Sequence, residues 1–197
     1  MKRVGIFGGS FDPVHIGHTA LANYIVQTGM VDEVWLTLSP QNPFKIGHHL
    51  TDDEHRLEML RIATSQFPEI IRPCEIELSM PRPSYTIDTL RSLAQLHPDY
   101  RFKLIIGADN WLKFDNWRLH EAIIQEFGVI IYPRTGYEIA SEKLPDNVTA
   151  IDAPKIEVSS TWIRNAIAKN RNVNYFMPAG VYPYIKDNKL YTIDYEH

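Results

Sequence analysis

Short apolar runs alternate with amphipathic segments along most of this chain, and this alternation limits the possible folds more than any other feature. Apolar runs of strand length cover residues 2–7, 33–38, 70–78, 102–106, 128–132 and 148–151. Segments with apolar residues at helical spacing cover residues 16–26, 51–66, 84–96, 119–126, 159–169 and 178–185. Apolar strands that alternate with helices form βα units, in which a mostly parallel sheet carries helices on both faces. The sequence therefore predicts an α/β fold.

Two of the expected helices begin with recognisable capping signals. Residues 51–54 have the pattern of a capping box, in which the side chains of the first and fourth residues bond to backbone N–H groups. Ser84 stands where its hydroxyl could cap the helix over residues 84–96. We expect both helices to start at these signals.

The length of the chain allows one sizeable hydrophobic core. It has 197 residues, of which 44% are hydrophobic, which is too little for two large domains. We expect a single domain over residues 1–197, in which residues from about 159 onward form a small helical part.

Charge and composition exclude several classes of partner. The net charge is −4 and no basic stripe is visible, so a nucleic-acid polymer is not expected to bind. No run of about 18 apolar residues and no signal peptide is visible, which argues against a membrane and for a cytoplasmic location. Cys74 is the single cysteine, so we expect a buried apolar residue and neither a disulfide nor a multi-cysteine zinc site.

The loop after the first strand has the features of a phosphate site. Gly8 and Gly9 allow the backbone to turn sharply and to approach a ligand, and Pro13 fixes the approach to the next helix. The N-terminus of that helix presents unpaired N–H groups and the positive end of the helix dipole. His15 and His18 are three residues apart, so both imidazoles can face one phosphate.

Other interpretations of this loop fit the sequence less well. It has neither the Gly-Lys-Ser/Thr of a Walker A loop nor the Gly-x-Gly-x-x-Gly of dinucleotide-binding folds. Two histidines at this spacing could bind zinc, but no third ligand stands near them in the sequence. A Gly-rich turn alone, or one histidine alone, is most often structural.

Residues 8–18 resemble the His-x-Gly-His signature of the nucleotidylyltransferase superfamily, in the version found in bacterial nicotinate-nucleotide adenylyltransferases. The resemblance implies a Rossmann-like sheet with a small helical C-terminal part. It also implies that His18 stabilises charge developing on the α-phosphate of ATP and that His15 orients the triphosphate, both as hydrogen-bond donors. Further ATP contacts are implied within the same segment, at Gly8, Gly9, Ser10 and Phe11.

A second segment, near the C-terminus, agrees with this resemblance. Ser159, Ser160 and Thr161 begin a helix, and Arg164 follows one turn later. Hydroxyls, free N–H groups and a forked guanidinium suit phosphate oxygens, although alone they would be an ordinary helix cap. The segment resembles the superfamily's Ile-Ser-Ser-Thr-x-x-Arg, with Val158 in place of Ile, which implies that these residues hold the triphosphate.

A third match is specific to the nicotinate branch of the superfamily. Residues 84–90, Ser-Tyr-Thr-x-Asp-Thr-Leu, would otherwise be an amphipathic helix. The resemblance implies that Tyr85 and Thr86 lie beside the pyridine ring, with backbone N–H groups near Thr86 meeting the ring carboxylate. It also implies that Trp117 stacks on the ring, whereas without the family Trp117 would be taken as a core residue.

The remaining candidates stand in loops after expected strands. Gly107 and Asp109 follow one strand and are assigned to ATP, where Asp109 could bond a ribose or fix the loop. Lys45 could meet the phosphate of the mononucleotide or be a solvated surface residue, and its neighbour Phe44 replaces the histidine usual in the family. Arg134 matches a family arginine and is assigned to the mononucleotide.

The resemblance implies transfer of AMP from ATP to nicotinate mononucleotide, giving nicotinate adenine dinucleotide and pyrophosphate in NAD biosynthesis. Mg²⁺ is implied as a cofactor, held mainly by the ATP phosphates, because no carboxylate cage is visible in the sequence. The partners are then ATP and nicotinate mononucleotide, and a homo-oligomer is compatible with the sequence.

Three alternatives stay open. The acceptor could be nicotinamide mononucleotide, or pantetheine phosphate, although His15 argues against the latter because that branch usually has threonine there. The chain could also be a non-catalytic sensor that binds ATP and releases no pyrophosphate. The presence of His15, His18 and Arg164 favours catalysis.

Overall fold

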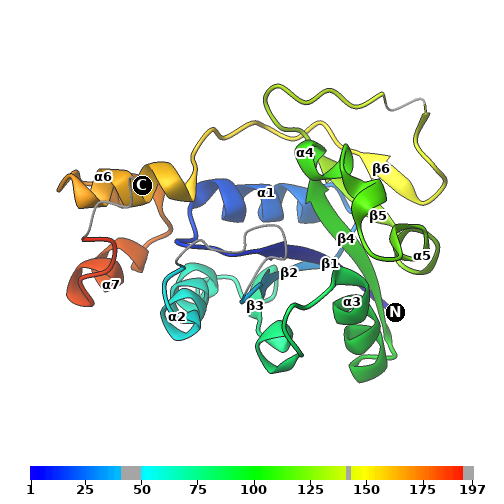
Figure 1. Cartoon of the computed structure of the whole chain (residues 1–197), viewed down its shortest axis with the longest axis horizontal. Helices are drawn as coiled ribbons and strands as arrows, with labels where there is room; N and C mark the ends of the chain where they lie inside the picture. Colours follow the sequence, from blue (N-terminus) through cyan, green and yellow to red (C-terminus); the bar gives the residue numbers. More distant parts are fainter. Residues whose placement is uncertain (41–49, 141–142, 193–197) are drawn as a thin grey trace.

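A six-stranded sheet in the order β3-β2-β1-β4-β5-β6, with every neighbouring pair parallel, organises the molecule (Figure 1). The computed structural model describes residues 1–40, 50–140 and 143–192. The strands are β1 Lys2–Gly9, β2 Glu33–Leu38, β3 Ile71–Cys74, β4 Tyr100–Gly107, β5 Val129–Tyr132 and β6 Val148–Ala150. The predicted parallel α/β fold is therefore confirmed.

Two hydrophobic cores lie on opposite faces of the sheet, because successive side chains of a strand point to opposite faces. On one face, Phe7 and Ile105 pack with α1 (Ile16–Gln27) and α2 (Asp53–Thr64). On the other face, Ile6 and Leu104 pack with further helices. These are α3 (Thr86–Leu96), α4 (Ala108–Trp111) and α5 (His120–Glu126), together with a 3₁₀ turn at Phe114–Asn116. This explains why the strands are apolar on both sides.

The strand order reverses at β1, which pairs with β2 on one side and with β4 on the other. In open parallel sheets a crevice forms at such a reversal, outside the carboxyl ends of the strands, and ligands bind there. β1 ends at Gly9 and β4 ends at Gly107, so the loops after these two strands border the crevice.

The C-terminal part is helical, as expected from the sequence, and lies with α2 at one end of the molecule (Figure 1). It consists of α6 (Ser160–Ala168), a 3₁₀ turn (Asn174–Phe176) and α7 (Val181–Asp187). After α7, Tyr191 is buried and its hydroxyl donates to Asp12 Oδ1 at 2.6 Å. The C-terminal part is thus bonded to the loop after β1.

One predicted strand is only half correct. The apolar run at 70–78 forms β3 only as far as Cys74, which is buried as expected, and continues as a 3₁₀ turn at Ile76–Ser79. The reason is Glu77, whose buried carboxylate accepts hydrogen bonds from the hydroxyls of Ser39, Ser84 and Thr89. A carboxylate that turns inward to three donors ends the extended backbone.

The two predicted capping signals were wrong. Ser84 bonds to Glu77, and α3 begins after Tyr85 without a side-chain cap. The capping box at 51–54 does not form, since α2 begins after Asp52 without a side-chain cap, and the carbonyl of Thr51 accepts from Arg56 Nε at 2.8 Å. At Ser84 a tertiary partner replaces the local one, and Thr51 also has a distant partner, because its backbone N–H donates to Asp12 Oδ2 at 3.5 Å. Within residues 1–40, 50–140 and 143–192, no helix combines the length and apolarity needed to cross a bilayer.

We predict that Tyr191→Phe destabilises the protein. The substitution removes one hydroxyl from a buried bond to a carboxylate, and hydrogen bonds to charged groups contribute about 1.5–3 kcal/mol. Urea denaturation should show a loss of that size. Tyr175→Phe is the matched control, because Tyr175 is 91% exposed and its change should stay within about 0.5 kcal/mol. Equal effects of the two substitutions would contradict the prediction.

Candidate active site

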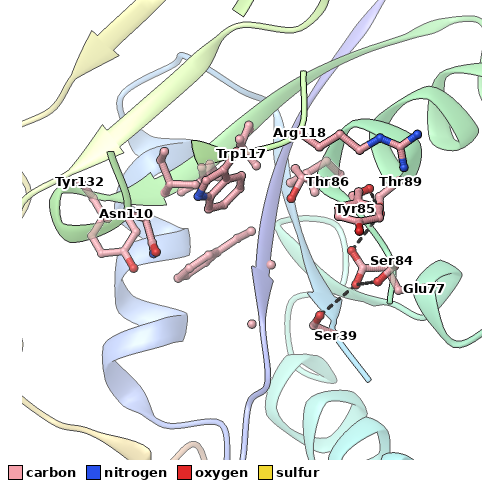
Figure 2. Close-up of a pocket in the computed structure, with 18 of the residues that line it drawn as sticks. Ser39, Glu77, Ser84, Tyr85, Thr86, Thr89, Asn110, Trp117, Arg118 and Tyr132 are labelled. Carbon is pink, nitrogen blue, oxygen red and sulfur yellow. Dashed lines mark hydrogen bonds between the residues drawn. The ribbon is translucent and has the colours of Figure 1, made fainter. Parts of the chain in front are cut away.

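Two cavities open at the carboxyl ends of the central strands, and they share Phe7 and Tyr132 as a common wall. Cavity A, drawn in Figure 2, is lined by Gly8, Gly9, Ser39, Glu77, Tyr85, Thr86, Gly107, Asn110, Trp117 and Arg118, among others. Cavity B is lined by His15, His18, Asp109, Arg134, Ser159 and Trp162, among others. Two ligands that occupy these cavities could therefore meet at the end of β1.

The two histidines hold each other in place at the start of α1. His15 is the residue before the helix, and its backbone N–H donates to His18 Nδ1 at 3.1 Å. The two rings stack with centroids 3.7 Å apart and an interplanar angle of 27°. Phe11 packs edge-on against His18, with centroids 5.0 Å apart. Gly17 completes the arrangement, because a Cβ there would lie 3.0 Å from the His15 ring.

This geometry fixes the protonation of the histidines. His18 Nδ1 accepts a hydrogen bond, so the ring proton of neutral His18 must be on Nε2. Burial, and then the nearby charges of His15 and Arg134, hold the pKa of His18 well below its usual value. Burial and the charge of Arg134 lower the pKa of His15 to about 4. Both rings are therefore neutral at neutral pH, and His18 is a hydrogen-bond donor through Nε2.

Helix α6 is bonded directly to the loop that carries the histidines. Ser160 Oγ donates to the carbonyl of Pro13 at 2.9 Å, and Arg164 Nη1 donates to the carbonyl of Asp12 at 2.7 Å. Arg164 Nη2 also donates to Thr161 Oγ1 at 3.3 Å. The two signature segments, which lie at opposite ends of the sequence, thus border one cavity.

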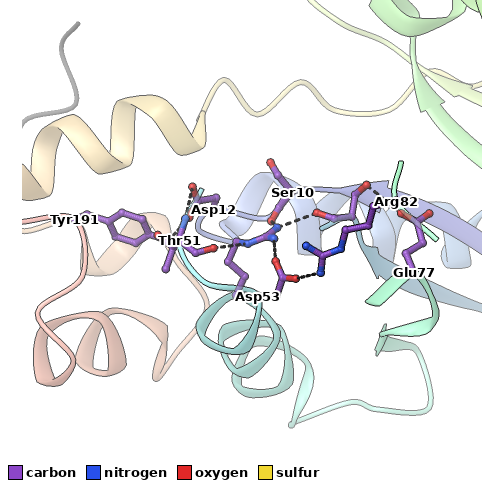
Figure 3. Close-up of polar contacts among 9 residues, drawn as sticks. Ser10, Asp12, Thr51, Asp53, Glu77, Arg82 and Tyr191 are labelled. Atoms are coloured by element: carbon purple, nitrogen blue, oxygen red, sulfur yellow. Dashed lines mark hydrogen bonds and ion pairs between the residues drawn. The ribbon is translucent and has the colours of Figure 1, made fainter. Parts of the chain in front are cut away.

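A buried arginine, Arg56, is bonded to the same loop, and Figure 3 labels Ser10, Thr51 and Asp53 among its partners. Arg56 is fully buried, and its Nη1 donates to the carbonyls of Ser10 at 2.6 Å and Ser39 at 3.0 Å. Its Nη2 bonds to Asp53, whose other oxygen accepts from Arg82 at 2.8 Å. The residues that follow β1 and β2 are therefore held at a fixed separation. Nothing in the sequence indicated this role for Arg56.

Asp109 and Arg134, which follow β4 and β5, line cavity B. Arg134 Nε lies 3.6 Å from Asp109 Oδ1, and Arg134 Nη2 donates to Tyr132 Oη at 3.3 Å. Gly107 permits this arrangement, because a Cβ there would collide with Asp109 Oδ1. Asp109 Oδ1 is buried and has no hydrogen-bond partner among the described residues.

The structure divides the residues predicted from the sequence into three sets. Cavity A is lined by Tyr85, Thr86 and Trp117, which were assigned to the mononucleotide, and also by Gly8, Gly9 and Gly107, which were assigned to ATP. Cavity B is lined by His15, His18, Asp109, Arg134 and Ser159, so Arg134, assigned to the mononucleotide, stands with the histidines. The third set packs or bonds around the loop after β1, and it comprises Ser10, Phe11, Ser160, Thr161 and Arg164.

Lys45 and Phe44 lie outside the described residues. Sequence reasoning missed Glu77 and Arg118, which line cavity A, and Trp162, which lines cavity B.

Among residues 1–40, 50–140 and 143–192, no group of three or more His, Cys, Asp or Glu side chains could hold a metal ion.

Known proteins are similar to this chain in sequence and in fold. The cytidylyltransferase-like family model matches residues 6–166. A nicotinate-nucleotide adenylyltransferase assigned in Bacteroides thetaiotaomicron is 45% identical over 185 residues, covering 94% of this chain and 91% of that protein. A nicotinate-nucleotide adenylyltransferase from Bacteroides fragilis, assigned by sequence, is 46% identical over 180 residues. The match covers 91% of this chain and 89% of that protein. The Plasmodium falciparum nicotinic acid mononucleotide adenylyltransferase, solved with NaAD, superimposes with a TM-score of 0.79 at 25% identity over 100% of both chains.

A family model that spans most of the chain, together with the parallel sheet and its crevice, defines an enzyme of the nucleotidyltransferase class. The two Bacteroides relatives, 45% and 46% identical over 94% and 91% of this chain, identify the family within this class. The chain belongs to the nicotinate-nucleotide adenylyltransferase family, and the resemblance found in the sequence is confirmed.

The lowered pKa of His15 predicts a pH dependence of stability. Between pH 6.5, the ordinary pKa of histidine, and its folded-state pKa of about 4, the unfolded chain binds a proton that the native chain does not. The free energy of unfolding should therefore fall as pH decreases through this range. His15→Asn cannot titrate and should lose this contribution. Urea unfolding of both proteins at about pH 7.5 and about pH 5 measures the effect, and a stability difference independent of pH would contradict it.

Proposed function

We propose that this chain transfers AMP from ATP to the phosphate of nicotinate mononucleotide, and that cavity B holds the triphosphate while cavity A holds the mononucleotide. The observation that carries the proposal is the common wall of Phe7 and Tyr132. Across this wall, the two histidines of cavity B adjoin Tyr85 and Trp117 of cavity A. Such adjacency is what a direct transfer between two bound nucleotides requires.

His18 is the main donor to the α-phosphate. Its Nε2 proton is fixed by the bond from the His15 N–H to its Nδ1, and its ring is neutral, so it can stabilise developing negative charge without first changing protonation. Ser159 and the N-terminus of α6 add hydroxyl and N–H donors on the same side.

Arg134 acts on the triphosphate rather than on the mononucleotide. It lines cavity B, and its charge is a cause of the lowered pKa of both His15 and His18. A guanidinium that stands this close to neutral donors can bind the β- and γ-phosphates while His18 remains on the α-phosphate.

In cavity A the pyridine ring packs against Trp117 and its carboxylate meets the start of α3. Tyr85 and Thr86 lie at that helix start, where the unpaired backbone N–H groups favour an anion. The Plasmodium enzyme with this fold was solved with NaAD, the compound that contains both halves, which supports two adjoining nucleotide sites.

The reaction then needs little from the protein beyond positioning. An ionised oxygen of the mononucleotide phosphate attacks the α-phosphorus, a new P–O bond forms, and the bond to the β-phosphate oxygen breaks to release pyrophosphate. The attacking oxygen carries no proton, so no general base is required. A divalent cation, which we propose to be Mg²⁺, enters with ATP and is held by its phosphates and water.

His18→Ala should lower turnover with the fold intact. Removing one preorganised donor to a transition-state oxyanion typically reduces kcat by about 10²–10³, or about 2.7–4 kcal/mol. Continuous measurement of pyrophosphate release tests this. His97→Ala is the matched control, because His97 ends α3 and packs on Tyr100, away from both cavities, and its turnover should match the wild type. Near-normal turnover of His18→Ala would refute the assigned role.

The choice of acceptor is tested separately. Pyrophosphate release is measured with ATP and each of nicotinate mononucleotide, nicotinamide mononucleotide and pantetheine phosphate. We expect the acid mononucleotide to have the highest kcat/KM. A higher kcat/KM for another acceptor would overturn the substrate, and ATP binding without pyrophosphate release would favour the sensor.

A further inference from the structure

Cavity A carries very little charge. Among the described residues that line it, Arg118 is the only cation and Glu77 is the only anion. Glu77 is buried and already accepts three hydrogen bonds, from Ser39 at 3.0 Å, from Ser84 at 3.0 Å and from Thr89 at 2.9 Å. The Glu77 carboxylate is therefore used within the cavity wall, where it links Ser39, Ser84 and Thr89. The charged group that remains available to a ligand is the guanidinium of Arg118.

Arg118 is placed at the start of α3. It directly follows Trp117, and its guanidinium lies over the ring of Tyr85, 4.8 Å from the ring centroid. Figure 2 labels both side chains. Its Nη1 lies 3.5 Å from Asp88 Oδ2 in the first turn of the helix. The cation thus stands within one helical turn of the N–H groups proposed to meet the ring carboxylate.

The side chain is only loosely held there. The contact with Asp88 is long, and the two side chains are 54% and 42% exposed, so the ion pair contributes little. Stacking on Tyr85 fixes the plane of the guanidinium without using its N–H groups. Those donors can therefore turn from Asp88 to a stronger partner at modest cost.

Backbone donors alone distinguish an acid from an amide weakly, because an amide oxygen also accepts from N–H groups. A guanidinium distinguishes them more strongly. It donates two parallel hydrogen bonds to a carboxylate, whereas the NH₂ of an amide would face its donors unpaired. A cavity with one available cation is thus suited to a ring that bears a carboxylate.

We propose that the side chain of Arg118 sets the preference of this chain for the acid mononucleotide. When that mononucleotide binds, the guanidinium gives up its contact with Asp88 and binds the ring carboxylate, and it stays stacked on Tyr85. This inference rests on the proposed function and adds a specificity-determining residue to it. Asp88 acts as the competitor that holds the guanidinium when the cavity is empty.

The test compares kcat/KM for nicotinate and nicotinamide mononucleotides in the wild type and in Arg118→Gln. The variant should lose at least about tenfold with the acid and change less than about twofold with the amide, with the KM for ATP unchanged. Equal losses with both acceptors, or no loss with the acid, would overturn the inference. A wild type inactive with both acceptors would instead contradict the proposed function itself.

Two further variants separate specificity from structure. Asp88→Asn removes the competitor and should lower the KM for the acid without changing that for the amide; an unchanged or higher KM for the acid would count against the inference. Arg91→Gln removes an arginine of α3 itself, which pairs with Glu126, and should leave both acceptors unaffected. A loss of acid preference in Arg91→Gln would assign the effect to the general charge of the helix and overturn the role of Arg118.

Discussion

The hydrogen bonds from α6 to the loop after β1 are the contacts on which the rest of the site depends. Ser160 reaches Pro13 and Arg164 reaches Asp12 across 147 and 152 residues of sequence. Asp12 is bonded from both sides, because its carbonyl accepts from Arg164 and its carboxylate accepts from Tyr191. Since Arg56 fixes the neighbouring Ser10 carbonyl, the loop has little freedom to move away from α6.

A loop held in this way can keep two histidines neutral and oriented. Burial lowers the pKa of both rings, and the backbone N–H of His15 selects the tautomer of His18. Neutral donors are already in the form that the transition state needs, whereas a histidinium would also bind the ground state strongly. In the proposed function, charge comes instead from Arg134, which lines the cavity, and from the divalent cation proposed to enter with ATP.

The sequence was a good guide wherever the signal is local. Strands 33–38 and 102–106, the helix that begins at Ile16 and the Ser159 cap of α6 follow from periodicity and from capping chemistry, and the structure has them. The histidine pair could be predicted for the same reason, since its spacing lies within one helical turn. The family resemblance then supplied Tyr85, Thr86 and Trp117 of cavity A, but neither Glu77 nor Arg118.

Residues whose partners are distant in the sequence could not be predicted. Glu77 ends β3 early because it bonds to side chains from three other segments, and Ser84 does not cap α3 because it is one of them. Arg56 and Tyr191 look like surface residues of a helix and a tail, yet both are buried against the first loop. Only the folded chain brings these groups together.

The central claim is that the histidines donate hydrogen bonds while the acceptor phosphate attacks the α-phosphorus directly. Stereochemistry at that phosphorus tests the claim most directly, using ATP in which sulfur replaces one α-phosphate oxygen in a single configuration. A single in-line displacement predicts inversion of configuration in the dinucleotide product. Retention would require two displacements through a covalent adenylyl-enzyme, with a histidine as nucleophile, and would contradict the account.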